Sequence, residues 1–234
     1  MSMNLLKKLN EYDGRTPEER AYAIVNHVVD FFITAVIVVA LIIGGYSYYI
    51  YQRQLNKADI GYTGYTMEQL GAVGWITIDH TDIDYPIMQG KTNTEYLNRN
   101  PLGEMSLSGS IFLDSASKSD FSDPYSIIYG HHMAQGKMFG ALDAYHDSGY
   151  LNKHATGTLK TRKGKTYSLK IVSCISISGK NQTVFDVQQN ISDKKKELIR
   201  LSPVLAENNK KILVLSTCQD TETDERTVVF ATYE

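Results

Sequence analysis

A cysteine follows a short strand-like segment near the C-terminus, and a thiol in that position can act as a nucleophile. Residues 212–215 form an apolar run rich in branched side chains, which predicts a buried strand. Cys218 comes after this run and after the small polar residues Ser216 and Thr217. A side chain at the end of a strand is held rigidly and can face a cleft. The thiolate of such a cysteine attacks carbonyl carbons.

Two further side chains have the chemistry that such a thiol needs. Arg226 follows Cys218 at short range, and the apolar run 228–231 after it predicts the next strand. A neighbouring cation favours the thiolate and stabilises a carbonyl oxygen that gains charge. His131 directly follows Gly130 where another strand-like segment ends, and an imidazole there can act as acid or base. Two neighbouring antiparallel strands would bring the thiol and the guanidinium to one site.

Each of these residues also has a simpler interpretation. A free cysteine is more often a small buried hydrophobe than a nucleophile. Cys174 fits that description, because it lies among alternating apolar residues, whereas Cys218 follows polar ones. Arg226 can instead form a surface ion pair with Asp224 or Glu225. The set of Cys, His and Arg contains no Asp or Asn to orient the histidine, which distinguishes it from papain-like sites.

The histidine pair at 131–132 raises the question of a metal site. The surrounding residues have no recognisable ligand spacing, so no metal is predicted. If the strand persists, His132 points to the opposite side from His131. The remaining histidines of the C-terminal part lie in polar, loop-like surroundings and are expected to be solvated: His80, His146 and His154.

Length and composition restrict the classes of protein. The 234 residues allow one ordinary domain and an additional segment, and a net charge of −2 suggests no nucleic-acid partner. Sixteen tyrosines, with many Thr, Val and Ile, favour a strand-rich fold. With only two cysteines, a disulfide framework is not expected.

An uncharged apolar stretch near the N-terminus predicts a membrane span. Residues 31–51 are dominated by Ile, Val, Ala and Phe, and as a helix they would be about 30 Å long. Tyrosines at the end of this stretch match an interfacial aromatic belt, and no small-residue cleavage site follows it. Basic residues are more numerous before the span than after it, which favours a cytoplasmic N-terminus. A buried core helix and a cleaved signal peptide are the alternatives.

The rest of the chain reads as short strands with few helices. Strands are expected at 74–78, 85–88, 109–114, 126–129, 157–161, 167–178, 212–215 and 228–231. Helices are expected at 66–70, 93–100, 137–145 and 192–205, the last with Ser192 as its N-cap. Seven or eight strands of this kind argue for one closed or nearly closed β-barrel.

Several motifs, in their order along the sequence, resemble those of the sortase transpeptidases of Gram-positive bacteria. Leu215-Ser216-Thr217-Cys218 with Arg226 downstream and Tyr129-Gly130-His131 upstream carry the resemblance. Further segments look like the class B branch: Gly74-Trp75-Ile76, Asp84-Tyr85-Pro86-Ile87, Gly109-Ser110-Ile111-Phe112-Leu113-Asp114, Tyr129-Gly130-His131-His132-Met133 and the helix before the last two strands. The resemblance covers residues 73–234 and the anchor topology.

The resemblance implies a mainly β fold, the sortase-type eight-stranded barrel, after one N-terminal transmembrane helix. It implies that Cys218 attacks the Thr carbonyl of a C-terminal sorting signal of the Asn-Pro-x-Thr-x kind and forms a thioester. An amine of the peptidoglycan peptide would then release the product. His131 would be the general acid and base, Arg226 the oxyanion or substrate clamp, and Ser216 and Thr217 residues that touch the substrate. No cofactor and no metal are implied.

The expected layout follows from these assignments. Residues 1–30 would be a cytoplasmic segment, 31–51 the transmembrane signal anchor, 52–72 a spacer with a short helix, and 73–234 an extracellular catalytic domain. The expected partners are surface proteins with sorting signals, a peptidoglycan amine and membrane lipid. The alternatives are a pilin-polymerising sortase of the same fold, a cysteine hydrolase that uses water, and a tethered barrel that binds peptide without chemistry.

Overall fold

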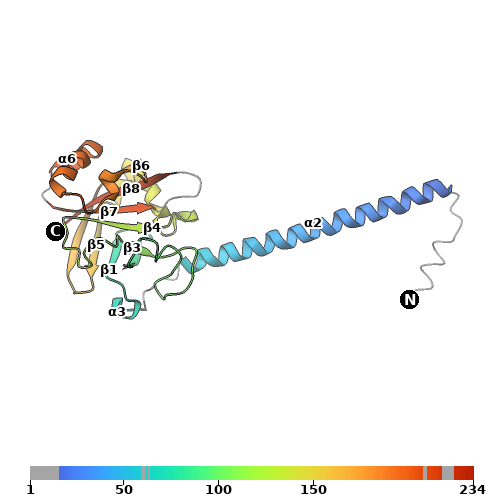
Figure 1. Cartoon of the computed structure of the whole chain (residues 1–234), viewed down its shortest axis with the longest axis horizontal. Coiled ribbons are helices and arrows are strands. Elements are labelled where there is room, and N and C mark those ends of the chain that lie inside the picture. The colour runs from blue at the N-terminus through green and yellow to red at the C-terminus, as the bar shows by residue number, and fades with distance from the viewer. Residues whose placement is uncertain (1–15, 59–61, 63, 208–209, 218–223) are drawn as a thin grey trace. The chain divides into compact units, whose positions relative to one another are not determined.

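The computed structural model describes residues 16–58, 62, 64–207, 210–217 and 224–234, and for 54–58 and 207 it describes the backbone alone. The chain divides into two compact units, 1–52 and 53–234. The second unit contains all the strands, and the first contains most of one long helix (Figure 1).

Eight strands form a closed barrel in the order β1-β2-β3-β4-β7-β8-β6-β5 (Figure 1). Their bounds are β1 Gly74–Ile78, β2 Asp84–Met88, β3 Ile111–Leu113, β4 Tyr125–Gly130, β5 Thr156–Thr161, β6 Thr166–Ser178, β7 Lys211–Thr217 and β8 Glu225–Tyr233. The eight-stranded barrel that the sequence predicts is therefore confirmed. The β5–β6 hairpin is antiparallel, as the sequence also suggests.

The continuous apolar runs of β7 and β8 arise because both strands are buried on both faces. Leu213 and Leu215 point into the barrel, whereas Ile212 and Val214 belong to a second cluster on the outside. Leu198 of helix α6 (Ile191–Leu201) belongs to this outer cluster. Strands covered on both faces lose the alternation of polar and apolar residues.

The order of the strands brings one end of each of three strands to the same edge of the barrel. β4 and β7 are parallel neighbours, with Tyr129 opposite Ser216 and Gly130 opposite Thr217. β8 runs antiparallel on the other side of β7, so its first residues lie beside the last residues of β7. The ends of β4 and β7 and the start of β8 therefore meet at the same edge.

Short helices cover the barrel, and their bounds are α3 Met67–Leu70, η1 Ala134–Gly136, η2 Phe139–His146, α4 Ser148–Lys153, α5 Gln182–Phe185, α6 Ile191–Leu201 and η3 Pro203–Glu207. The 3₁₀ helix η2 buries Phe139, Leu142 and Tyr145 in the inner core cluster. The helix expected at 137–145 is thus present as η2, and η1 precedes it.

Two helix expectations are wrong in detail. Residues 93–100 form successive turns with one bridging residue at 99, not a helix. A proline disfavours helical torsions in the residue before it, and Asn100 precedes Pro101. The N-cap of α6 is Asn190, whose side chain accepts a hydrogen bond from the backbone N–H of Ser192. An asparagine one residue before the first helical residue is as good a cap as serine.

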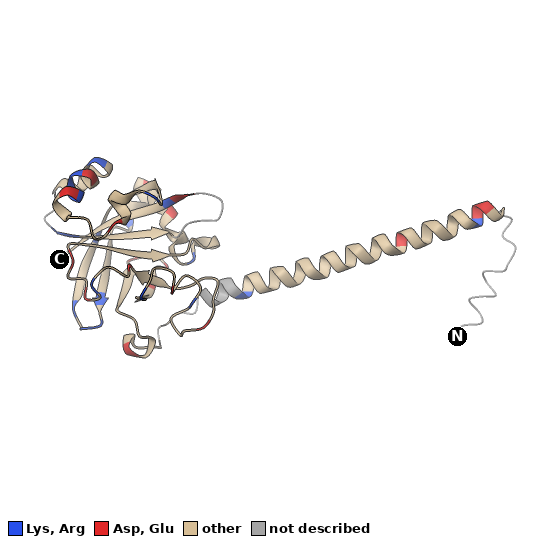
Figure 2. Ribbon diagram, in the orientation of Figure 1, with Lys and Arg blue, Asp and Glu red and all other residues tan. Residues whose placement is uncertain are grey.

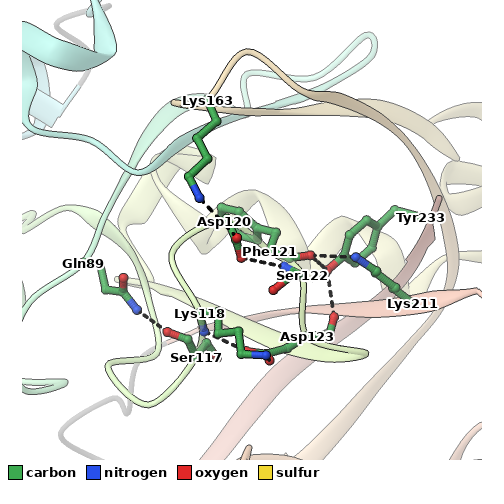
Figure 3. Close-up of polar contacts among 10 residues, drawn as sticks. All are labelled: Gln89, Ser117, Lys118, Asp120, Phe121, Ser122, Asp123, Lys163, Lys211 and Tyr233. Atoms are coloured by element: carbon green, nitrogen blue, oxygen red, sulfur yellow. Dashed lines mark hydrogen bonds and ion pairs between the residues drawn. The ribbon is translucent and has the colours of Figure 1, made fainter.

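The loop between β3 and β4 folds under the barrel and closes its other end. Phe121 is fully buried although its φ is 55°, a conformation uncommon for an aromatic residue. Its carbonyl accepts hydrogen bonds from the Tyr233 hydroxyl and the Lys211 ammonium, each at 3.1 Å (Figure 3). Gln89 donates to the carbonyl of Ser117, so side chains from three other parts of the chain hold the loop in its strained conformation.

Helix α2 (Pro17–Ala58) extends well beyond the apolar stretch that the sequence marks. Its segment Pro17–Arg53 has a mean hydropathy of 2.6 over its most apolar window, which is long and apolar enough to cross a membrane. The sequence has no charged residue between Asp30 and Arg53, and Figure 2 shows a long uninterrupted tan stretch in this helix. Most of the large apolar side chains of this stretch are exposed, so they do not form part of a protein core.

Candidate active site

A pocket of about 460 Å³ opens beside the end of β4 and the start of β8. The loop after β2 and the segment after β6 complete its walls. Its described lining residues are Asn93, Thr94, Leu97, Phe112, Tyr129, His131, Gly179, Phe185 and Arg226. Two of the predicted catalytic residues, His131 and Arg226, therefore face the same pocket. The lining contains hydrogen-bond donors and a cation, and none of its described residues is a carboxylate. Such a pocket favours a peptide oxygen that gains negative charge.

His131 directly follows the last residue of β4, and its imidazole is held by a backbone carbonyl. Its Nε2 lies 2.6 Å from the carbonyl oxygen of Leu97. Because a carbonyl oxygen only accepts, Nε2 carries the proton, and in the neutral ring Nδ1 is the basic nitrogen. The sequence offered no Asp or Asn as an orienting group, and the structure shows that Leu97 takes this role.

Gly130 lets β4 pack closely at its last position. A Cβ at this position would lie 2.3 Å from the Cδ1 atom of Ile111 and 2.7 Å from the Cγ atom of Phe139. No real side chain tolerates such contacts, so glycine allows β4 to pack against both residues up to its last position. His131 is thereby fixed at the edge of a rigid strand.

Arg226 lies near the start of β8 and stacks on an aromatic ring. Its Cζ atom is 5.0 Å from the centroid of the Phe185 ring. Gly179 makes room for the side chain, because a Cβ at that position would lie 2.5 Å from the Arg226 Nε atom. The Nε atom is buried and has no hydrogen-bond partner in the described part of the chain. The guanidinium is therefore positioned by packing.

Among the described residues no ion pair joins Arg226 to Asp224 or Glu225, although its charge is the smallest of the causes that lower the pKa of Asp224. The Asp224 carboxylate accepts a hydrogen bond from the Ser178 hydroxyl at 2.9 Å and pairs with Lys180 at 3.2 Å. These contacts, the Ser178 hydrogen bond first, lower the pKa of Asp224. Asp224 is thus occupied by other partners.

Two further predicted site residues, Ser216 and Thr217, lie at the end of β7. Ser216 is fully buried, and its hydroxyl donates to the carbonyl of Thr217 at 3.0 Å. Thr217 is nearly buried, and its hydroxyl accepts from the backbone N–H of Thr227 at 3.1 Å. Neither side chain lines the pocket, so a substrate contact from Ser216 or Thr217 stays a prediction. Cys218 lies outside the described residues, bonded directly to Thr217.

A buried carboxylate fixes one wall of the pocket. The Asp114 Oδ2 atom accepts hydrogen bonds from the Tyr129 hydroxyl at 3.0 Å and from the Asn93 amide at 2.8 Å. The Asn93 carbonyl oxygen in turn accepts from the backbone N–H of Ser115. Sequence reasoning missed Asn93, although Asp114 directly after an apolar strand was an available signal. Leu97 and Phe185 carried no signal at all.

The other cysteine and the histidine pair behave largely as expected. Cys174 packs against the inner core, and burial, with a smaller effect from Asp143, raises the pKa of its thiol to about 12. His132 does not line the pocket; its Nε2 bonds to the Asp143 carboxylate at 2.6 Å. Of the histidines expected to be solvated, His154 instead stacks on Tyr150 at 4.0 Å. Among the described residues no cluster of His, Cys, Asp and Glu suits a metal ion.

The comparison with known proteins agrees with this geometry. The sequence model of the sortase domain matches residues 76–234. The chain belongs to the sortase family. Sortase B of Staphylococcus aureus is 34% identical over 168 residues, which are 68% of this chain and 68% of that protein. Sortase B of Listeria monocytogenes is 36% identical over 160 residues, which are 65% of this chain and 64% of that protein.

Solved structures place this sortase in class B. A crystal structure of a Streptococcus pyogenes class B sortase involved in pilus biogenesis superposes with a TM-score of 0.64 at 35% identity. The match covers 73% of this chain and 99% of that one. Sortases are cysteine transpeptidases, so the protein is an enzyme of that class, with the class B barrel.

Proposed function

We propose that this sortase cleaves a C-terminal sorting signal of the Asn-Pro-x-Thr-x kind after its Thr and transfers the protein to a peptidoglycan amine. One observation carries the proposal. The two strands that flank β7 are β4 and β8, and they place His131 and Arg226 at one pocket. β7 itself leads into Cys218, so the thiol is the natural third member of the set.

The reaction has two acyl-transfer steps. The Cys218 thiolate attacks the Thr carbonyl carbon, a C–S bond forms, and the carbonyl oxygen takes up the negative charge. The C–N bond of the peptide then breaks, and the leaving amine takes a proton from His131. The acceptor amine attacks the thioester, loses a proton to His131, and the C–S bond breaks to restore the thiolate. The thioester conserves the energy of the cut peptide bond, so no nucleotide is needed.

Arg226 has the properties of an oxyanion or substrate clamp. Its guanidinium faces the pocket, stacks on Phe185 and has no carboxylate partner among the described residues. A fixed cation in a partly closed pocket stabilises the developing oxyanion without first having to reorient. A guanidinium already neutralised by Asp224 would do so less well.

The proposal includes a membrane anchor formed by residues 31–51. The N-terminal segment 1–30 would be cytoplasmic, 52–72 would be a spacer, and the domain 73–234 would be extracellular. The bias of basic residues before the span supports this orientation. A tether of this kind raises the effective concentration of an enzyme whose substrates are held at the same membrane.

The test uses the full-length chain in detergent micelles and quenched fluorogenic peptides of the Asn-Pro-x-Thr-x form. We expect Cys218→Ala and His131→Ala to abolish cleavage, and Cys174→Ala to retain most of it. With an added amine the product should be the amide, whereas a hydrolase gives only the acid. Mass spectrometry should detect an acyl adduct on Cys218 in the absence of the amine. Full activity in the Cys218→Ala protein would refute the proposal.

Pilin polymerisation is the second candidate, favoured by the likeness to the S. pyogenes class B sortase involved in pilus biogenesis. In that case the acceptor is a lysine side chain of another protein subunit. Offering a peptidoglycan stem peptide and a lysine-containing pilin peptide in competition separates the two functions, because the amide product identifies the amine that was used.

A further inference from the structure

A chain of hydrogen bonds runs behind the pocket and links three separate parts of the barrel. The Asp143 carboxylate of η2 lies 2.6 Å from the His132 Nε2 atom with one oxygen. Its other oxygen accepts from the Thr227 hydroxyl at 2.9 Å. The backbone N–H of Thr227 donates to the Thr217 hydroxyl at 3.1 Å. Asp143 therefore bridges the end of β4 to the start of β8, and Thr227 extends the link to the end of β7.

Three residues of this hydrogen-bonded network are sequence neighbours of residues to which catalysis is assigned above. His132 follows His131, Thr227 follows Arg226, and Thr217 precedes Cys218. Consecutive side chains of an extended segment point to opposite sides. In agreement with this, none of His132, Thr227 and Thr217 lines the pocket, whereas His131 and Arg226 do. The hydrogen-bonded network thus lies on the opposite side of the backbone from the side chains of His131 and Arg226.

The element that carries Asp143 is itself fixed to the end of β4. The backbone N–H of Phe139 donates to the carbonyl of His131 at 3.0 Å, and His132 pairs with Met138 in an isolated bridge. Gly140 approaches so closely that a Cβ there would lie 2.1 Å from the carbonyl oxygen of Met133. Because η2 is held in this way, its carboxylate is presented to the strand ends from a rigid support.

We propose that Asp143 is a positioning residue, which sets the spacing of the catalytic side chains through their sequence neighbours. The inference rests on the proposed function, because it takes the roles of His131, Arg226 and Cys218 from there. A displacement of about 1 Å in a reacting group lowers the rate by about 100-fold. The carboxylate has two oxygens and uses one for each strand end, so it holds both at once.

Because the network is exposed, its effect on catalysis can be measured separately from its effect on stability. The side chain of Asp143 is 51% exposed and that of His132 is 40% exposed. Ion pairs with this exposure contribute little to the free energy of unfolding. Loss of Asp143 should therefore lower Tm by no more than about 4 °C in a domain of this size. A large loss of activity at nearly unchanged Tm is the signature of a positioning role.

The experiment measures kcat, KM and Tm of the full-length chain in detergent micelles, with the quenched Asn-Pro-x-Thr-x peptides. We expect Asp143→Ala to lower kcat by 10- to 100-fold while KM changes less than threefold. Asp143→Asn retains one accepting oxygen and the same shape, so it should stay within about fivefold of the wild-type kcat. Thr227→Val removes the hydroxyl and keeps the branched shape, and it should lower kcat about tenfold, whereas Thr227→Ser should restore it.

A double variant tests whether the two residues act through one chain of bonds. If they do, Asp143→Ala with Thr227→Val loses no more activity than the larger single loss, whereas independent effects multiply. Glu197→Ala is the matched control, because Glu197 is a half-exposed carboxylate that pairs with Arg200 on α6 at 2.7 Å. It should leave kcat unchanged.

Three results would overturn the positioning role. They are a kcat of Asp143→Ala within twofold of wild type, multiplicative losses in the double variant, and a fall of Tm by more than about 4 °C that accompanies every loss of kcat. Failure of the proposed function is seen separately, because Cys218→Ala would then retain activity whatever Asp143 does.

Discussion

The guanidinium of Arg226 lies over the ring of Phe185, with 5.0 Å between its Cζ atom and the ring centroid. The two residues come from β8 and α5, and both line the pocket that His131 also faces. An aromatic ring holds a cation in place without neutralising its charge. The pairing therefore explains how an arginine can be fixed in a pocket whose described lining has no carboxylate.

Replacing Phe185 should weaken catalysis through Arg226. Phe185→Ala removes a cation–π contact of about 1 kcal/mol and frees the guanidinium, so we expect kcat/KM to fall about tenfold. Phe185→Tyr keeps the ring and should remain within about twofold of wild type. Steady-state cleavage of the quenched peptides measures both. Equal activity in the Ala and Tyr variants would show that the ring does not position Arg226.

The bond from His131 to Leu97 predicts the tautomer of the catalytic imidazole. Because the Leu97 carbonyl accepts from Nε2, the neutral ring should carry its proton on Nε2 and present Nδ1 as the base. Nitrogen-15 NMR of histidine-labelled protein distinguishes the two nitrogens by chemical shift, and the His131→Gln variant assigns the signal. A neutral ring that carries its proton on Nδ1 would contradict the structure.

The thiol of Cys174 should react slowly with alkylating reagents. Burial raises the pKa of its thiol to about 12, so at pH 8 almost none of it is thiolate, and the thiolate is the reactive form. We expect iodoacetamide to modify Cys174 at least tenfold more slowly at pH 8 than a free cysteine peptide. Mass spectrometry of the digested protein follows each cysteine separately. Rapid labelling of Cys174 in the native protein would contradict this assignment.

Buried Lys194 should make the stability depend on pH in the alkaline range. Its side chain is fully buried, its ammonium donates to the Asp186 carbonyl, and it lies 4.0 Å from the Tyr125 ring centroid. Burial is the main cause that lowers its pKa from 10.5 to about 8. Between these two values the unfolded chain binds the proton and the folded chain does not. The free energy of unfolding contributed by this group therefore rises with pH across that window, by roughly 3 kcal/mol in total.

The comparison of Lys194→Met with wild type isolates this effect. Urea unfolding at pH 7.5 to 10, followed by the fluorescence of Trp75, the single tryptophan, should show the wild type gaining stability relative to the variant as pH rises. Titrating tyrosines and Cys174 are common to both proteins and cancel in the difference. Lys196→Met changes an exposed lysine two residues away and should give a difference that is flat in pH. A flat difference for Lys194→Met as well would refute the lowered pKa.

Phe121 should be one of the costliest core positions. It is fully buried, and it closes the end of the barrel opposite the pocket. Phe121→Ala should lower the free energy of unfolding by about 3–5 kcal/mol, because a large cavity replaces the ring. Met105→Ala, at a position that is 79% exposed, should change it by less than about 0.5 kcal/mol. A small effect at Phe121 would mean that the loop around it can collapse into the cavity.

The strands, and the positions of His131 and Arg226 at strand ends, could be predicted from the sequence because their signals are local. The apolar runs before Thr217 and after Arg226 mark β7 and β8, and a glycine marks the sharp end of β4 before His131. These patterns follow from burial and from the torsions of single residues. They are enough to predict a barrel whose strand ends carry the chemistry.

The supporting contacts were not readable, because they join segments that are distant in sequence through single atoms. Every residue type has a backbone carbonyl, so no sequence pattern marks that of Leu97 as the partner of His131. Phe185 lies in a short helix, α5, for which the periodicity gave no signal. The expected helix at 93–100 is replaced by turns, whose backbone hydrogen bonds depend on contacts with residues after Pro101, such as the bridge between Arg99 and Met105.

The parallel pairing of β4 with β7 also determines when the enzyme becomes competent. Everything from η1 to η3 lies between these strands along the chain, and such distant pairings form slowly, after local structure. A polypeptide still emerging from the ribosome, or arrested before its last strands dock, carries its reactive groups without assembling a catalyst. Topology alone thus delays the appearance of activity until the native state is reached.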